Sequence, residues 1–152
     1  MQADFDECRA YVTHVLTEHQ RLHALLDDAR STIAQTRADG KNQSSEVVQV
    51  LRQIRGELQQ HFTEEEEGGC LDEAVSRLPR LAAEVDRIEA EHPDLLRRLD
   101  RLIEMASDSE KMTKDRPLFD QELNNFYQGI HAHEGAENRL LQQGFGMTID
   151  GE

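Results

Sequence analysis

Cysteine is scarce in this chain, whose 152 residues include only Cys8 and Cys70. Two cysteines so far apart in the sequence suggest neither a disulfide framework nor a thiolate metal site. The sequence therefore predicts two free thiols in a cytoplasmic protein.

Long apolar runs and basic residues are also in short supply. No segment approaches the roughly 18 consecutive apolar residues of a membrane-spanning helix, and the acidic start MQADFDECRA has no apolar stretch typical of a secretory signal. Lysine and arginine number 17 against 31 aspartates and glutamates, which gives a formal net charge of −14. This charge argues against a nucleic-acid partner and is favourable for binding cations. We find no nucleophile–base pair and no phosphate-binding loop, so a hydrolase or transferase is not indicated.

Few β-branched or alternating runs occur, and the sequence therefore predicts an all-α fold. Four amphipathic segments predict helices over residues 4–39, 44–67, 79–106 and 116–143 of a single domain, 1–152. Asp39-Gly40 is expected to end the first helix and Gly68-Gly69 to interrupt the second, followed by a short helical piece over 71–77. The segment SDSEKMTKD is expected to form a polar loop. Four such helices most often form an antiparallel up-down four-helix bundle.

Each predicted helix carries one inward-facing stripe at steps of three and four residues. In chain order the stripes are Val12, Leu16, His19, His23, Leu26, Ile33; Val47, Leu51, Ile54, Leu58, His61, Glu65; Leu81, Val85, Ile88, His92, Leu95 or Leu96, Leu99, Ile103; and Phe119, Leu123, Phe126, Ile130, His133, Glu137, Leu141. Histidines and glutamates thus stand at positions that are otherwise apolar.

These polar residues fall into two matching sets, and this repeat makes the two halves of the chain pseudo-equivalent about a two-fold axis. The sets are His19 with His61 and Glu65, and His92 with His133 and Glu137, with His19 and His92 preceded by Glu18 and Glu91. Inward carboxylates are very costly unless they are paired or bind a metal ion. Imidazole and carboxylate repeated in this way are the ligands of a non-haem di-iron centre.

Other polar residues beside the motifs are interpreted differently. His14 and His131 are expected in solvent, and Glu64, Glu66, Glu67 and Glu134 are expected off the inward face. Of these, Glu64, three residues after His61, is kept as a weaker candidate ligand. Pro93, next to His92, is expected to kink the third helix; whether the kink aims His92 or has no role stays open.

The segments EHQRLHALL, HFTEEEEGG, EHPDLLRRL and HAHEGAENRLL resemble the hemerythrin superfamily, in particular its bacterial HHE cation-binding branch, over essentially the whole chain. The resemblance implies a four-helix bundle that holds two iron ions with an oxo or hydroxo bridge. It carries ligand roles onto His19, His61, Glu65, His92, His133 and Glu137, with the two glutamates bridging the metals. The oxygen-carrying hemerythrins have a further histidine where this chain has Leu96, and His23 is the candidate that could replace it.

The expected function is therefore binding or sensing of a small ligand, O2, NO or peroxide, at an iron pair. An oxidoreductase of the peroxidase or catalase type is the first alternative, and iron storage or delivery is the second. If His23 binds iron, one metal is saturated and the other stays open; if it does not, both metals keep open positions, which favours peroxide or NO chemistry.

Overall fold

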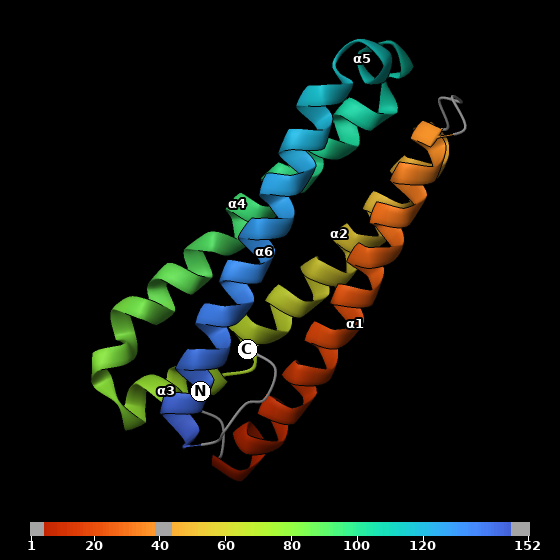
Figure 1. Cartoon of the computed structure of the whole chain (residues 1–152). Helices are drawn as coiled ribbons and strands as arrows, with labels where there is room; N and C mark the ends of the chain where they lie inside the picture. The colour runs from red at the N-terminus through yellow and green to blue at the C-terminus, as the bar shows by residue number, and fades with distance from the viewer. Residues whose placement is uncertain (1–4, 39–43, 147–152) are drawn as a thin grey trace.

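The computed structural model describes residues 5–38 and 44–146, and every regular element in these ranges is a helix (Figure 1). The elements are α1 (Phe5–Ala38), α2 (Ser44–Glu67), α3 (Cys70–Arg77), the 3-10 turn η1 (Pro79–Leu81), α4 (Ala82–Ser107), α5 (Ser109–Lys114) and α6 (Arg116–Phe145). The prediction of an all-α protein is confirmed. The expected end of the first helix at Asp39-Gly40 lies outside the described residues.

Four long helices, α1, α2, α4 and α6, make up most of the fold. Contacts join α1 to α2, α2 to α4, α4 to α6 and α6 to α1, so the four surround a common interior. Figure 1 shows the short helix α3 at one end of this group and α5 at the other, and it shows α4 bent along its length. Pro93 lies inside α4, where it removes a backbone donor. In the described part of the chain, no helix is both long and apolar enough to cross a membrane.

The helix α5 corrects the prediction that SDSEKMTKD is a loop. The Asp108 side chain caps this helix by accepting hydrogen bonds from the backbone N–H groups of Glu110 at 3.0 Å and Lys111 at 3.1 Å. Met112 then buries its side chain against the main core. The polar composition of the segment does not indicate a helix. One N-cap and one buried apolar side chain are enough to stabilise a helix this short.

The turn between α2 and α3 overturns the prediction of two free thiols. Gly69 has a φ of 79°, a left-handed conformation that glycine adopts without strain, and the chain turns there into α3. The turn brings Cys70 beside Cys8 of α1, with 5.4 Å between their Cα atoms, and the two form a disulfide. Such bonds persist mainly in oxidising compartments, so this finding gives no support to the predicted cytoplasmic location.

The core consists of two hydrophobic clusters that a polar layer separates. The first cluster contains residues such as Leu22 and Ile130, and the second contains residues such as Val15 and Leu140. On α1, His19 stands between Val15 of the second cluster and Leu22 of the first; α4 repeats this order, and on α6 the order along the chain is reversed. The candidate ligands therefore lie at the level where apolar packing is interrupted.

The buried faces differ from the predicted stripes on α1 and α4. On α1 the buried positions include Leu22 and Ala29, whereas the side chain of His23 is 42% exposed. On α4 the stripe gave Leu95 or Leu96, and Leu95 is the buried one, but Leu102 is buried where the stripe named the half-buried Ile103. Both errors have one cause: adjacent positions at the edge of a stripe differ by about 100° around the helix, and only the packing partners decide between them.

Candidate metal centre

Six side chains from the four long helices form the polar layer. His19 comes from α1, His61 and Glu65 from α2, His92 from α4, and His133 and Glu137 from α6. All six are buried, with exposed fractions between 1% for Glu137 and 6% for His61. Within α2 and α6 the histidine and glutamate are four residues apart, which places them one above the other on the inner face. The structure therefore brings the six predicted ligands together.

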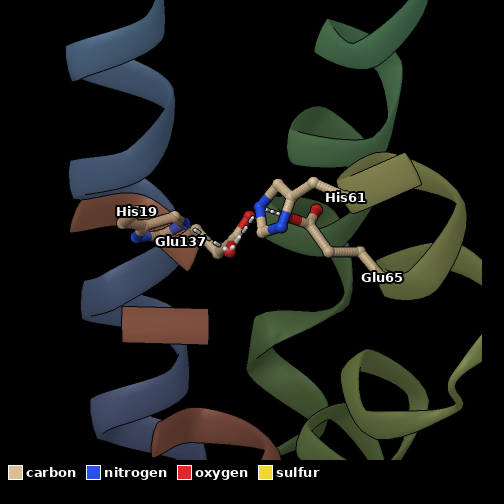
Figure 2. A group of neighbouring side chains, drawn as sticks. All are labelled: His19, His61, Glu65 and Glu137. Atoms are coloured by element: carbon tan, nitrogen blue, oxygen red, sulfur yellow. Dashed lines mark ion pairs between the residues drawn. The ribbon is translucent and has the colours of Figure 1, made fainter. Parts of the chain in front are cut away.

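The six side chains form two groups of four that share both glutamates. One group contains His19 and His61, the other contains His92 and His133, and in each the ligand atoms lie within 4.8 Å of one another. Figure 2 shows the first group, in which the carboxylate of Glu137 lies near both imidazoles. Each group has the size and the donor types of a site for one metal ion.

The shared glutamates turn one carboxylate oxygen toward each group. Oε1 of Glu65 contacts Nε2 of His61, while Oε2 of Glu65 lies 2.9 Å from Nε2 of His92. Oε1 of Glu137 lies 3.2 Å from Nε2 of His19 and 3.6 Å from Nε2 of His61, and Oε2 of Glu137 lies 3.6 Å from Nε2 of His133. Each carboxylate could thus bridge two neighbouring ions.

The layer fits metal ions because its polar atoms lack other partners. Within the described ranges, the Nε2 atoms of the four histidines and the four carboxylate oxygens make no hydrogen bond, and their close contacts are only the ion-pair contacts with one another given above. Buried polar atoms are normally satisfied, and leaving one without a partner costs about 1–3 kcal/mol. Here eight such atoms point at one region. Bound cations would supply their missing partners, because carboxylates and neutral imidazoles both bind cations.

Without cations, burial and the neighbouring charges shift the pKa values of the layer. Burial and the charge of Glu137 raise the pKa of Glu65 well above its usual value. Burial alone would lower the pKa of His61, but the Glu137 and Glu65 carboxylates outweigh it and raise this pKa to about 12. The pKa of His92, in contrast, is lowered by burial. Binding of metal ions would therefore displace protons from Glu65 and His61.

The glutamates of the two Glu-His dipeptides hold the imidazoles of the neighbouring helices. Oε2 of Glu18 lies 2.5 Å from Nδ1 of His61, and Oε1 of Glu91 lies 2.9 Å from Nδ1 of His133. A carboxylate at Nδ1 fixes the imidazole tautomer that leaves Nε2 free for a metal ion. The sequence pattern alone predicts no role for these glutamates, although their repetition before His19 and His92 is a signal for one.

The two groups differ in their access to solvent. A cavity of about 90 Å³ between α1 and α2 is lined by residues that include His19, His61 and Gln60. On the other side, the ring of Phe62 stacks on His92 with 4.0 Å between centroids and meets His133 edge-on at 5.4 Å. The His19–His61 group is therefore open toward a cavity, while the His92–His133 group is covered by an aromatic ring.

Tyr11 is a further residue near the centre, and the inward stripes do not include it. In the part of the chain that is described, its buried hydroxyl has no hydrogen-bond partner. Burial, together with the charges of Glu65 and Glu137, raises its pKa. Tyr11 precedes Glu18 by seven residues, two turns on the same side of α1, and this spacing was the signal that could have located it.

The two further candidate ligands lie outside the two groups. Nε2 of His23 lies 2.5 Å from Oε2 of Glu134, and Oε2 of Glu64 lies 3.3 Å from Nε2 of the exposed His14. Glu134 belongs to neither ligand group, as expected for a residue off the inward face, but it is buried, at 5% exposed, beside His23 of α1. His131 is exposed, as predicted, and its ring meets that of His23.

Comparison with known families gives a match to a cation-binding domain. The family model described as the hemerythrin HHE cation binding domain matches residues 11–143, which include all six residues of the polar layer. Searches of curated proteins and of solved structures returned no match.

Proposed function

This chain belongs to the hemerythrin family of HHE cation-binding domains, and we propose that it binds two iron ions and, at this iron pair, a small ligand such as O2, NO or peroxide. The observation that carries the proposal is the pair of shared glutamates, each with one oxygen toward either imidazole pair. In the same proposal the four long helices form an antiparallel bundle, and its halves are related by a pseudo-two-fold axis.

His19 and His61 would hold one ion, His92 and His133 the other, and Glu65 and Glu137 would bridge them. Two neutral imidazoles and one carboxylate oxygen from each glutamate suit iron, although zinc and manganese accept similar ligands. The two glutamates bring two negative charges when ionised, so two cations also relieve the repulsion between them. Four protein donors per ion leave coordination positions for a further ligand.

Iron, when bound, supplies the change in oxidation state and the open coordination positions that O2, NO or peroxide require. The residues around it decide where such a ligand arrives. The cavity of about 90 Å³ beside His19 and His61 is large enough for a diatomic molecule, since one water needs only about 10–15 Å³. Phe62 covers the opposite group. We therefore expect the ligand to reach the His19–His61 side first.

Filling this cavity with a larger side chain tests whether the small ligand enters through it. Gln60 lines it, whereas the neighbouring Gln59 does not, and both are exposed residues of α2. Gln60→Phe should slow the association of O2 or NO with the iron-loaded protein, and Gln59→Phe should leave the rate unchanged. Equal rates in both variants would show that the ligand enters elsewhere.

Peroxide turnover is a second candidate function, and the position of His23 favours it. His23 contacts Glu134 and belongs to neither group of candidate ligands. Without a fifth imidazole neither metal is saturated, and two open positions suit a substrate that must react with both metals.

Anaerobic iron loading, followed by elemental analysis and optical spectra with O2, NO and peroxide, separates the possibilities. Two irons per chain and a stable spectrum with O2 or NO support ligand binding. Two irons with rapid loss of peroxide and no stable adduct support the oxidoreductase. More than two irons per chain would indicate storage, and a single zinc ion from iron-replete cells would contradict the iron pair.

A further inference from the structure

A second cluster of metal-binding side chains lies outside the polar layer, between α1 and α6. It contains His23 of α1 with His131 and Glu134 of α6, and their ligand atoms lie within 4.8 Å of one another. Nε2 of His23 is 2.5 Å from Oε2 of Glu134, and the rings of His23 and His131 meet edge-on with 4.7 Å between centroids.

Glu134 separates this cluster from an ordinary surface ion pair. The residue is 5% exposed, and its Oε1 atom has no hydrogen-bond partner in the residues that the structure describes. A buried carboxylate is costly unless it is fully paired, and His23 satisfies only one of its two oxygens. The remaining oxygen is thus available to a cation beside two imidazoles.

The cluster formed by His14, Glu18 and Glu64 provides a comparison on the same molecule. Its three residues also lie within reach of one ion. It has no buried carboxylate, however, and Glu18 is already engaged with Nδ1 of His61. The arrangement of His14 is therefore explained by its ion pairs, whereas that of Glu134 is not.

We propose that His23, His131 and Glu134 form a third metal site, which binds one divalent transition-metal ion of the Zn²⁺ or Fe²⁺ type. Two imidazoles and one carboxylate are a common ligand set for these ions. Because the side chain of His23 is 42% exposed and His131 lies at the surface, the ion would keep a coordination position open to solvent. The site does not depend on the identity of the metals bound in the polar layer.

Calorimetric titration of the iron-loaded protein with Zn²⁺ tests this site, with elemental analysis before and after to establish that the iron is retained. We expect one Zn²⁺ per chain beyond the iron. His131→Ala removes a ligand at the surface, where the fold does not depend on it, and should weaken Zn²⁺ binding by more than about 100-fold, since even residues behind a ligand contribute 10–100-fold. Glu134→Gln should weaken it as well.

His14→Ala is the matched control, because it removes an exposed histidine from the comparison cluster; Zn²⁺ binding should be unchanged. Co²⁺ gives a second readout, since its visible absorption bands report direct ligation, and His131→Ala should abolish them. The proposal is overturned if the iron-loaded protein takes up no additional Zn²⁺, or if His131→Ala binds it as the unaltered protein does.

Discussion

The glutamates behind His61 and His133 offer the sharpest test of the centre, because their roles come from the structure and were absent from the sequence prediction. Replacing Glu18 by alanine removes the acceptor 2.5 Å from Nδ1 of His61, and replacing Glu91 removes the one 2.9 Å from Nδ1 of His133. Each imidazole would then be free to rotate or to change tautomer, and its Nε2 would be less available to a metal ion.

The structure also ranks the two effects. The side chain of Glu18 is 23% exposed and that of Glu91 is 42% exposed, so water can replace the second more easily. Loss of such a carboxylate lowers metal affinity 10–100-fold, and we assign about 100-fold (about 2.7 kcal/mol) to Glu18→Ala and about 10-fold (about 1.4 kcal/mol) to Glu91→Ala.

Competition with a chelator of known affinity measures these losses, with the iron content followed as the chelator is raised. Glu18→Ala should release one iron per chain well before the second, because the other imidazole pair is intact. Glu18→Gln keeps an acceptor oxygen, so its iron affinity should lie between that of the alanine variant and that of the unaltered protein. His14→Ala is the control for the 2.7 Å contact between His14 and Glu18. Unchanged release in Glu18→Ala, or simultaneous release of both irons, would refute the assigned role.

Four further predictions concern the layer itself. Glu65→Ala should remove a bridge and lower the iron content, whereas Glu67→Ala, at an exposed position, should leave it unchanged; if Glu64→Ala is the damaging change instead, the assignment of Glu65 as the bridging residue is wrong. Removal of the metals by a chelator should lower the melting temperature, since ions present at 100 times their dissociation constant stabilise the fold by about 2.7 kcal/mol, and equal melting temperatures would count against a buried site. In the metal-free protein the pKa of Glu65 is raised by burial and by the charge of Glu137, and the pKa of His61 is raised to about 12 by the neighbouring carboxylates. Metal ions must compete with protons for these groups, so metal affinity should fall as the pH is lowered. Calorimetry in buffers of different protonation enthalpy should detect released protons, and an absence of buffer dependence would contradict this. Tyr11→Phe removes a buried hydroxyl without a partner among the described residues and should stabilise the metal-free protein by about 1 kcal/mol in urea unfolding; a loss of that size would mean that the hydroxyl is hydrogen-bonded in solution.

Part of this architecture could be predicted from the sequence because two helices have strong stripes. On α2 the steps from Val47 to Glu65 alternate between four and three, and every residue of that stripe is buried. The stripe of α6 from Phe119 to Leu141 is buried as well. A regular stripe fixes the inner face of a helix, and the convergence of His61, Glu65 and Glu137 follows from it.

The errors arose where partners distant in the sequence decide the outcome. His23 and Leu22 are adjacent, but Leu22 is buried in the core, whereas His23 lies beside Glu134 of α6. The pairing of Cys8 with Cys70 depends on the turn at Gly69, which the spacing of the cysteines does not reveal. Such contacts can be predicted only when the three-dimensional arrangement of the helices is known.

The Glu-His dipeptides also determine how α1 and α4 are rotated about their own axes. Glu18 and His19 point about 100° apart around α1, so at one level the helix presents an imidazole to the centre and a carboxylate to α2. A turn of α1 that improved one of these contacts would spoil the other. Leucine and valine stripes tolerate small rotations, because apolar contacts have little directionality. Glu91 and His92 impose the same restriction on α4. The apolar clusters hold the helices together, and the polar layer fixes the rotation of α1 and α4 about their axes.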